Sequence, residues 1–423
     1  MNIINVENIT KSYTGRKLFA EASFYVQEHE KIGIIGINGT GKSTLLKIIA
    51  GQEEPDEGKV TKANHIVISY LSQNPDLDPD GSVIDEVMKK VKTTELDEHL
   101  KWSLESDAKS LLMNLDITDF EQKTGELSGG QRKRVALVAA VLKPCDVLIL
   151  DEPTNHLDIE SVEWLEDFLR NYSGAFIVIS HDRYFLDRVT NKTFELENGR
   201  FRSYNGNYSA YMAQREIDKK TEQRNYDNTM REIQRLENVV EQQRRWGREK
   251  NIKTAESKMK VIERLEKDLN APMQSPEEME FTLQACAGGG QDVVQTESLG
   301  MAFDNNRLFS NVDMLIKKGE KVFLLGPNGC GKTTLLKILM GDYEQTEGSY
   351  KIGANIHIGY YDQIQENLNM DKTVIDEVWD EYPNLTQTQI RNALAVFLFK
   401  GEDVFKEIHK LSGGERARVE LVK

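Results

Sequence analysis

The chain has 423 residues, more than one hydrophobic core usually spans, so its length predicts two or more domains. Its formal net charge is −15, which argues against wrapping by nucleic acid unless positive charge is concentrated locally. The longest apolar runs are far shorter than the roughly 20 residues that cross a bilayer, the N-terminal segment lacks the pattern of an export signal, and the three cysteines share no metal-ligand spacing. We therefore expect a cytoplasmic protein without a membrane segment.

The first predicted element that carries chemistry is a strand, a turn and a helix near the N-terminus. KIGIIG predicts a buried strand, and KSTLLKIIA predicts a helix after a glycine-rich turn. The turn fits G-x-x-x-x-G-K-[ST], in which backbone N–H groups converge on phosphate oxygens. Lys42 supplies a charge for the β and γ phosphates, and Ser43 offers a hydroxyl to Mg²⁺. The predicted ATP-binding residues here are Gly36, Asn38, Gly39, Thr40, Gly41, Lys42, Ser43 and Thr44.

A second glycine motif, LSGGQ, precedes the predicted helix RKRVALVAAVL. Its serine and the following backbone amides can donate to an anion at the start of that helix. The motif lacks the lysine of a phosphate loop, so we interpret it as a second clamp on the same ligand, and a simple Gly–Gly turn is the alternative. The predicted contacts are Ser128, Gly129, Gly130 and Gln131.

Two apolar runs, DVLILD and AFIVIS, predict central strands of an α/β sheet. Asp151 and Glu152 follow the first run, at the carboxyl end of a strand, where open α/β sheets bind ligands. We expect Asp151 to bind Mg²⁺ and Glu152 to act as the general base that polarises the attacking water. Adjacent acids in this place can also begin a helix. His181 follows the second run, and an isolated histidine there is usually structural.

A segment rich in charge and helix formers follows, and its apolar residues step by three or four in two runs. They predict two amphipathic helices with a turn near Trp246, and a first helix over Tyr208–Arg245 about 55 Å long. Between residues 244 and 260 seven basic side chains face two acidic ones, a net of +5 (7 − 2). This basic tip predicts RNA contact, with a solvated coiled coil as the alternative, and its residues are Arg244, Arg245, Trp246, Arg248, Lys250 and Lys253.

The chain then repeats its first part with an offset of about 290. GPNGCGKTT repeats the phosphate loop, and LSGGE repeats the clamp motif before the helix RARVELVK. Thr333 takes the place of the Mg²⁺-binding serine. The predicted ATP-binding residues of this copy are Gly326, Asn328, Gly329, Cys330, Gly331, Lys332, Thr333, Thr334, Ser412, Gly413, Gly414 and Glu415.

The repeat sets the predicted domains. They are a first cassette over 1–207, a helical linker over 208–287 and a second, incomplete cassette over 288–423. We expect the second copy to contain the strand before its phosphate loop, at residues 321–325. The counterpart of Asp151 would fall near position 435 (151 + 284), about 12 residues beyond Lys423, so we expect a C-terminally truncated fragment.

These motifs resemble the ATP-binding cassette superfamily over about four-fifths of the chain. The resemblance implies an α/β fold of two P-loop NTPase cassettes that pair head to tail, so that each ATP lies between one phosphate loop and the other signature motif. It gives His181 a role in orienting Glu152 or the water near the γ-phosphate. It also implies that Gln73 and Gln363 contact Mg²⁺ and water, that Tyr13 and Phe303 stack on adenine, and that Asp158 is the D-loop aspartate.

Tandem cassettes joined by a charged helical hairpin, with LDEPTNHLD and SHDRYFLD, resemble the ABC-F subfamily. This resemblance implies Mg²⁺-dependent ATP hydrolysis and action on the ribosome, with the linker directed toward rRNA and tRNA. The alternative is an ABC ATPase outside translation, such as a transporter's ATP-binding subunit or a DNA-maintenance ATPase.

Overall fold

The computed structural model describes residues 1–13, 16–37, 39–91, 98–155, 157–197, 199–245, 249–269, 279, 281, 290–303, 306–361 and 368–423. It divides into two compact units, which are described separately below: Met1–Pro272 with Gly326–Asn328, and Met273–Leu325 with Gly329–Lys423. Four residues with predicted roles lie outside the described residues: Asn38, Trp246, Arg248 and Gln363.

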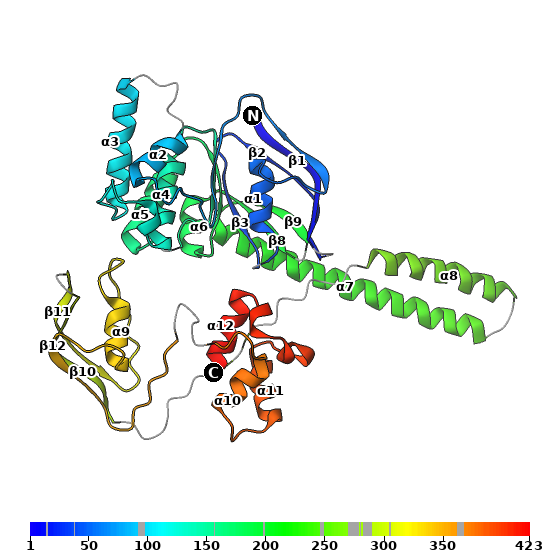
Figure 1. Ribbon diagram of the computed structural model, residues 1–423. Helices are drawn as coiled ribbons and strands as arrows, with labels where there is room; N and C mark the ends of the chain where they lie inside the picture. The colour runs from blue at the N-terminus through cyan, green and yellow to red at the C-terminus, as the bar shows by residue number, and fades with distance from the viewer. Residues whose placement is uncertain are drawn as a thin grey trace. The chain divides into compact units, whose positions relative to one another are not determined.

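The first unit is built on a six-stranded sheet with the strand order β5-β6-β7-β3-β8-β9. Figure 1 labels three of these strands, β3, β8 and β9. The strands from β5 to β8 run parallel, and β9 is antiparallel to β8. The two apolar runs predicted as central strands form β6 and β7, which are buried along their whole length. The strand bounds are β3 (Lys31–Ile35), β5 (Ile68–Leu71), β6 (Val147–Asp151), β7 (Ala175–Ile179), β8 (Lys192–Glu197) and β9 (Arg200–Asn205).

A three-stranded antiparallel sheet and helix α1 cover one face of the six-stranded sheet. Side chains of β1, β2 and α1 share one apolar core with Val147, Ile149 and Ile177 of the large sheet. Burying this much apolar area is the main source of stability for the layer. The elements are β1 (Asn2–Tyr13), β2 (Arg16–Gln27), β4 (Glu57–Lys62) and α1 (Lys42–Ala50).

On the opposite face of the six-stranded sheet, five of the described helices share one apolar core with the strands. Leu148, Leu150 and Val178 point to this side, in alternation with the residues that face α1, as the period of two in a strand requires. Because both faces of β6 and β7 are covered, every residue of β7 is apolar, and so is every residue of β6 before Asp151. The helices are α2 (Val83–Val91), α3 (Glu98–Asn114), α4 (Gly129–Leu142), α5 (Ile159–Asn171) and α6 (Arg183–Val189).

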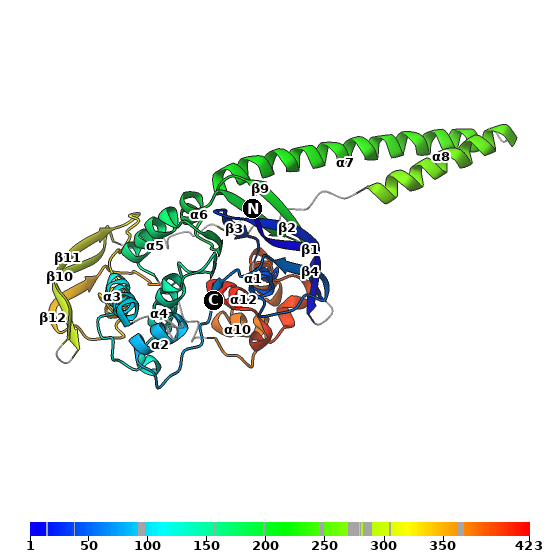
Figure 2. The same cartoon turned by 90° about the horizontal axis from the view of Figure 1, so that it is seen from above.

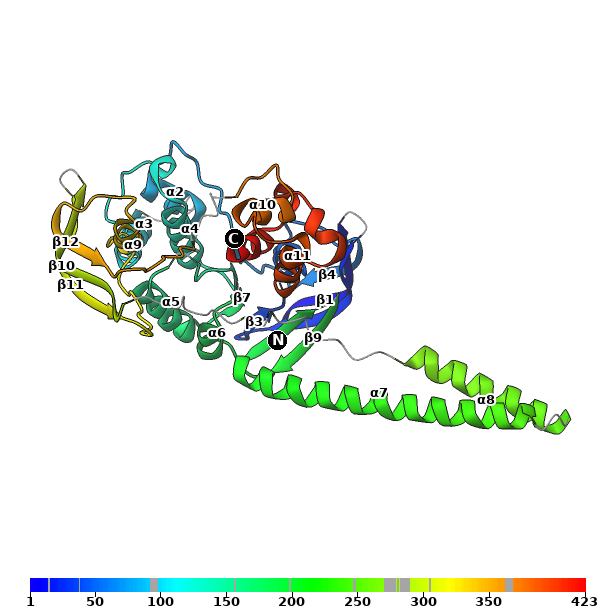
Figure 3. The ribbon, with the colours of Figure 1, turned by 90° about the horizontal axis from the view of Figure 1, so that it is seen from below.

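After β9 the chain forms a long helical hairpin (Figures 2 and 3). Helix α7 spans Tyr208–Arg245, the bounds that the sequence predicts, and α8 (Glu249–Asp268) packs against its distal part. The predicted apolar stripes meet in one cluster that includes Ile233, Val240 and Ile262. No helix in the described ranges is both long and apolar enough to cross a membrane.

The base of α7 is fixed to the six-stranded sheet by a largely buried polar network. Arg215 Nε lies 2.7 Å from Glu195 Oε1, and its guanidinium also pairs with Glu197. Tyr211 donates its hydroxyl hydrogen to Glu195 Oε1 at 2.6 Å, and Tyr204 donates to Oε2 at 3.3 Å. Both acids lie on β8, which pairs directly with the phosphate-loop strand β3. The hairpin is therefore attached to the strand beside the nucleotide loop.

Removing the cation from this network is expected to destabilise the first unit strongly. Arg215→Met leaves two buried carboxylates without a positive partner, which costs about 3–5 kcal/mol in the free energy of unfolding. Urea unfolding followed by far-UV circular dichroism measures the change. Lys220→Met is the matched control on the same helix, because its pair with Glu216 is exposed and contributes little to stability. Equal small effects of the two variants would contradict the prediction.

The second unit repeats elements of the first at nearly constant offset. Its antiparallel sheet has the order β11-β10-β12, which matches β2-β1-β4, and helix α9 packs on it through Leu335 and Ile338. A separate small core joins the remaining helices. The elements are β10 (Asp292–Phe303), β11 (Asn306–Lys317), α9 (Lys332–Met340), β12 (Glu347–Ile352), α10 (Val374–Glu381), α11 (Gln387–Val396), η3 (Gly401–Phe405), η4 (Ile408–Lys410) and α12 (Gly413–Val422).

The strand predicted at residues 321–325 is wrong. This described segment has no regular secondary structure, and Phe323 is 86% exposed. In the first unit the equivalent strand is β3, which forms its hydrogen bonds with β7 and β8. Both of these strands come after α4, the helix that follows LSGGQ, in sequence. The second copy as given ends at Lys423, before the equivalents of those strands. An isolated strand cannot satisfy its backbone donors and acceptors in a core, so the apolar sequence alone does not form one.

Candidate nucleotide site

The first phosphate loop joins β3 to α1 and depends on glycines with positive φ. Gly39 and Gly41 have φ values of 77° and 93°, in the left-handed region that favours glycine. A Cβ at Gly41 would lie 2.9 Å from Leu18 Cβ, and one at Gly36 would lie 2.2 Å from the Leu196 carbonyl oxygen. Nothing lies within 4 Å of the Cβ position at Gly39, so that side of the loop is open. The loop is thus packed against the protein on one side and accessible on the other.

Lys42 begins α1 and is buried, at 8% exposure. Its ammonium donates to the carbonyl oxygens of Gly36 at 2.8 Å and Ile37 at 3.0 Å. Burial lowers the pKa of Lys42, and the carboxylates of Glu152 and Asp151 oppose that shift. The cation is therefore held inside the loop, opposite the two acids at the end of β6.

Asp151 is the last residue of β6 and Glu152 follows it, and both are buried. Burial raises the pKa of Asp151, while a hydrogen bond from Ser43 and the charges of Lys133 and Lys42 oppose the shift. Asp151 Oδ1 and Glu152 Oε2 have no hydrogen-bond partner among the described residues. Buried, unpartnered carboxylate oxygens indicate that a ligand completes their bonding.

Mg²⁺ prefers oxygen ligands, and in nucleotide sites it takes one or two from the protein and others from phosphates and water. The hydroxyl of Ser43 and the free oxygen of Asp151 meet that requirement at the loop. The described residues contain no group of three or more acids, histidines and cysteines that could hold a metal by themselves. The residues present therefore fit a magnesium ion that arrives with a nucleotide.

His181 follows β7 and lies beside Glu152. Its Nε2 is 3.3 Å from Glu152 Oε1, and the histidine side chain is about half exposed. Glu152 itself has a φ of 53°, which is uncommon outside glycine, and its N–H donates to the Ile179 carbonyl at 2.9 Å. The strained backbone points the carboxylate toward His181 and away from the strand, a geometry typical of functional sites.

Lys42, Ser43, Glu152 and His181 line one pocket of about 560 Å³, a size that is typical of small-molecule sites. Tyr13 and Gln73, which are separated from the loop in sequence, also line it. Tyr13 is about half exposed, and its hydroxyl is bonded to Glu53. Sequence reasoning missed three lining residues, Leu18, Asn155 and Ile179. Asn155 stands in the NHLD part of LDEPTNHLD and Ile179 in the predicted strand AFIVIS, but Leu18 gave no chemical signal.

The serines of the two signature motifs, Ser128 of LSGGQ and Ser412 of LSGGE, each cap a helix. Ser128 Oγ accepts a hydrogen bond from the Gln131 amide at 3.2 Å, and the Gln131 side chain accepts from the Ser128 amide at 3.0 Å. Ser412 and Glu415 form the same reciprocal pair at 3.4 and 2.8 Å. Such a capping box fixes the start of the helix, where backbone N–H groups favour an anion.

Asp158 caps α5 by accepting a hydrogen bond from the Ser161 amide at 2.9 Å. It is not among the residues that line the pocket of the first unit. The described contacts of Asp158 thus include the cap of α5.

The second phosphate loop has the same backbone form as the first. Gly329 and Gly331 have φ values of 81° and 96°, and a Cβ at Gly331 would lie 2.8 Å from Phe309. Phe303 is 43% exposed, and its ring packs edge to face on Tyr343 at 5.8 Å between centroids. The offset of 290 places Tyr343 at the position that Glu53 takes beside Tyr13. An accessible aromatic residue therefore ends the first strand of each antiparallel sheet.

At the hairpin tip the described arginine side chains are partly paired. Arg245 lies 2.7 Å from Glu241, with both side chains mostly exposed, and Arg244 lies 2.8 Å from the Met259 sulfur. Lys250 and Lys253 belong to α8. An exposed pair of this kind is weak enough to exchange its partner for a phosphate.

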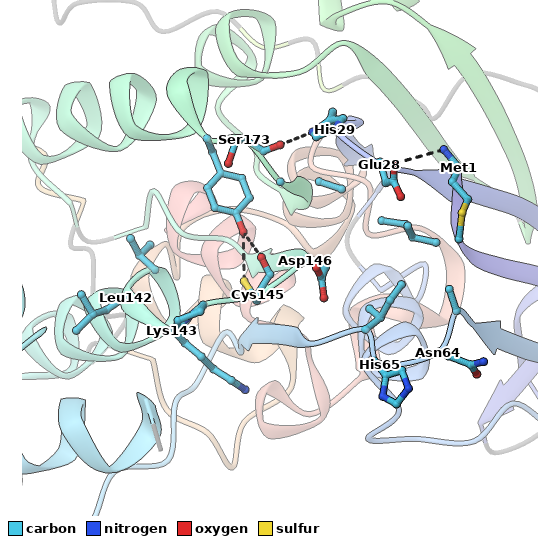
Figure 4. Close-up of a pocket in the computed structure, with 18 residues that line it drawn as sticks. Met1, Glu28, His29, Asn64, His65, Leu142, Lys143, Cys145, Asp146 and Ser173 are labelled. Carbon is cyan, nitrogen blue, oxygen red and sulfur yellow. Dashed lines mark hydrogen bonds and ion pairs between the residues drawn. The ribbon is translucent and has the colours of Figure 1, made fainter. Parts of the chain in front are cut away.

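A larger pocket of about 740 Å³ lies at the opposite edge of the sheet, before β6 and β7 begin (Figure 4). Its polar groups bond mainly to one another. The Tyr172 hydroxyl donates to the Cys145 carbonyl at 3.0 Å, and His29 Nδ1 pairs with the Ser173 carbonyl. Burial raises the pKa of the Cys145 thiol, which disfavours the reactive thiolate. We therefore place the nucleotide in the smaller pocket.

Comparison with known proteins agrees with this geometry. A family model described as ABC transporter matches residues 19–155 and again 309–423, and a second model with the same description matches residues 194–283. The ABC transporter ATP-binding protein YfmR of Bacillus subtilis is 36% identical, with 100% of this chain and 72% of the relative covered. ABC transporter F family member 5 of Arabidopsis thaliana is 31% identical, with 99% and 66% covered.

A third relative is the energy-dependent translational throttle protein EttA of Mycobacterium tuberculosis, which is 32% identical, with 99% of this chain and 80% of the relative covered. The two matched cassettes, the matched segment between them and relatives of the F family agree with the α/β P-loop architecture described above. The chain belongs to the ABC-F subfamily of the ATP-binding cassette superfamily and is an ATP hydrolase.

Proposed function

We propose that the first cassette hydrolyses Mg²⁺-bound ATP in the pocket at the carboxyl end of β6, and that the protein uses this reaction on the ribosome. One observation carries the enzymatic part: a buried lysine in a glycine loop lies near two buried acids, each with an oxygen that has no partner among the described residues, and the lysine and Glu152 line one small-molecule pocket. This arrangement suits phosphoryl transfer, in which positioning and electrostatics supply most of the catalysis.

In this proposal Ser43, Gln73 and Asp151 hold Mg²⁺. When bound, the ion neutralises charge on the β and γ phosphates. The open side of the loop at Gly39 receives the phosphates, and Tyr13 stacks on the adenine. Lys42 exchanges its two carbonyl acceptors for phosphate oxygens, a stronger charge-assisted contact.

Glu152 is the proposed general base. Its Oε2, which has no partner among the described residues, accepts a hydrogen bond from the attacking water. His181, 3.3 Å from the other carboxylate oxygen, holds the carboxylate in place and donates toward the γ-phosphate. The positive φ of Glu152 fixes the direction of this side chain.

The second cassette completes the first site in this proposal. Ser412–Glu415 bind the γ-phosphate of the ATP held by the first loop, and Ser128–Gln131 bind the ATP held by Lys332 and Gln363. Two capping boxes of the same form, each at a helix start, support equivalent roles. The proposed domains remain 1–207, 208–287 and 288–423, because α7 begins at Tyr208.

The ribosomal part rests on the hairpin and on the relatives. The tip carries local positive charge on an acidic chain, and one relative is named as a translational throttle protein. RNA offers phosphates for the arginines and bases for stacking on Trp246. We propose that rRNA and tRNA are the partners and that the protein works in the cytoplasm.

Sedimentation with ribosomes tests this function. The Glu152→Gln protein, held in its ATP state, is expected to co-sediment with ribosomes in the presence of ATP and Mg²⁺. Changing Arg244, Arg245 and Arg248 together to Glu is expected to weaken that binding at least about 100-fold, since three charge reversals remove phosphate contacts and add repulsion. ATP hydrolysis without ribosomes is expected to stay unchanged.

The control is a charge reversal on the same helix that lies away from the tip, Lys220→Glu, which should leave ribosome binding within about threefold. If the ATP-bound protein does not co-sediment with ribosomes, the alternative interpretation, an ABC ATPase outside translation, is favoured. Parallel loss of ATPase activity in the triple variant would instead give the hairpin a role in folding.

A further inference from the structure

We infer that Lys133 is a positioning residue for ATP hydrolysis in the first cassette and that it acts by holding the main chain of Glu152. The inference rests on the proposed role of Glu152 as general base. Lys133 belongs to α4, the helix that begins at the signature serine, and no sequence motif marks it as functional.

The contact is short and buried. Lys133 is 4% exposed, and its Nζ donates to the Glu152 carbonyl oxygen at 2.6 Å. The Asn155 amide donates to the same oxygen at 3.3 Å. A buried hydrogen bond from a charged donor is among the stronger contacts in a protein. Lys133 therefore supplies the shortest described contact to the Glu152 carbonyl.

The backbone at Glu152 needs such support. Its φ of 53° is unfavourable for a residue with a side chain, and strain of this kind persists only where surrounding contacts hold it. The Ile179 carbonyl accepts from the Glu152 amide at 2.9 Å, so β7 holds one side of this residue and α4 holds the other. Without Lys133 the Glu152 carbonyl keeps the longer Asn155 contact at 3.3 Å, so the peptide is held less firmly and the carboxylate loses its direction toward the pocket.

Lys133 also balances charge. Asp151 and Glu152 are adjacent and both buried, and Lys133 and Lys42 are the cations set against them. In the proposed reaction Lys42 turns to the phosphates. Lys133 does not move to the phosphates with Lys42, because it donates to the Glu152 carbonyl from the other face of the sheet. It thus keeps positive charge beside the acids throughout the cycle.

The second copy lacks this lysine. The offset of 284 aligns Lys133 with Ala417, while the flanking Arg132 and Arg134 align with Arg416 and Arg418. The two copies therefore keep both arginines and differ at the position between them. Since α4 carries both Ser128 at its start and Lys133 one turn later, contact of Ser128 with nucleotide and the placement of Glu152 are joined by one rigid helix.

The test is the kinetics of Lys133→Met, which keeps the length of the side chain and removes its charge and donor. We expect kcat to fall at least about tenfold while KM for ATP stays within about twofold, because positioning acts on the chemical step. Arg134→Met is the matched control. Arg134 is also buried on α4 and donates to a backbone carbonyl, that of Leu115 at 2.7 Å, away from the pocket. It should lower the melting temperature without this loss of kcat.

A double-mutant cycle separates positioning from folding. Lys133→Met added to Glu152→Gln should lower the remaining activity by less than about twofold, since the residue acts through Glu152. If Lys133→Met does not fold, Lys133→Arg and Lys133→Gln replace it, and the arginine variant should retain at least about tenfold more activity than the glutamine variant. An unchanged kcat in a folded Lys133 variant, alongside an inactive Glu152→Gln, overturns this inference alone. Full activity of Glu152→Gln overturns the proposed function instead.

Discussion

Glu152→Gln is expected to lower the turnover of ATP by roughly 10²–10⁴-fold and to leave ATP affinity within about threefold. The amide keeps the shape of the side chain, so the contact with His181 and the backbone bonds of residue 152 remain possible. Because an amide cannot take a proton from water, the substitution slows the chemical step and not the binding of ATP. Single-turnover hydrolysis measures the first effect, and titration with a fluorescent ATP analogue measures the second. Both are best made in a Lys332→Met background, so that the first site is observed alone.

Glu86→Gln is the matched control for this variant. Glu86 is a buried acid on α2 that is bonded to Lys89 at 3.0 Å and does not line the nucleotide pocket. It should leave turnover unchanged at a temperature where the protein is folded. If Glu152→Gln and Glu86→Gln have the same turnover, Glu152 is not the base.

Lys42→Met is expected to weaken ATP binding at least about 100-fold, which corresponds to about 2.7 kcal/mol. The lysine is the buried cation of the first loop, and a neutral side chain offers nothing to the β and γ phosphates. The loop carbonyls of Gly36 and Ile37 also lose their donor, so a moderate fall in thermal stability should accompany the loss of binding. Equilibrium titration with a fluorescent ATP analogue and Mg²⁺ measures the affinity, again with Lys332 replaced.

The control for Lys42→Met lies on the same helix. Lys47 is exposed on α1 and does not line the pocket, so Lys47→Met should bind ATP within about threefold of the parent protein. If Lys42→Met and Lys47→Met bind ATP with equal affinity, the first glycine-rich loop does not bind the phosphates.

The elements that depend on neighbours in sequence could be predicted from the sequence. The bounds of α7, the buried strand and helix on either side of the first phosphate loop, and the apolar stripes of the hairpin follow from periodicity and glycine spacing. Each is set by local hydrogen bonds and by one repeating apolar face. The same reasoning failed at residues 321–325, where the apolar sequence matches β3 but the described part of the second copy contains no equivalents of β7 and β8.

By itself, then, the sequence determined the tandem repeat, the glycine-rich turn between a strand and a helix, and the acidic pair at the end of a buried strand, because each is a short local pattern. Only the tertiary structure decided which distant groups meet. It set Lys133 against Glu152, joined Arg215 to β8, and brought Tyr13, Gln73 and His181 to one pocket. Such contacts cross long stretches of chain, and they depend on how whole layers pack, which no local spacing encodes.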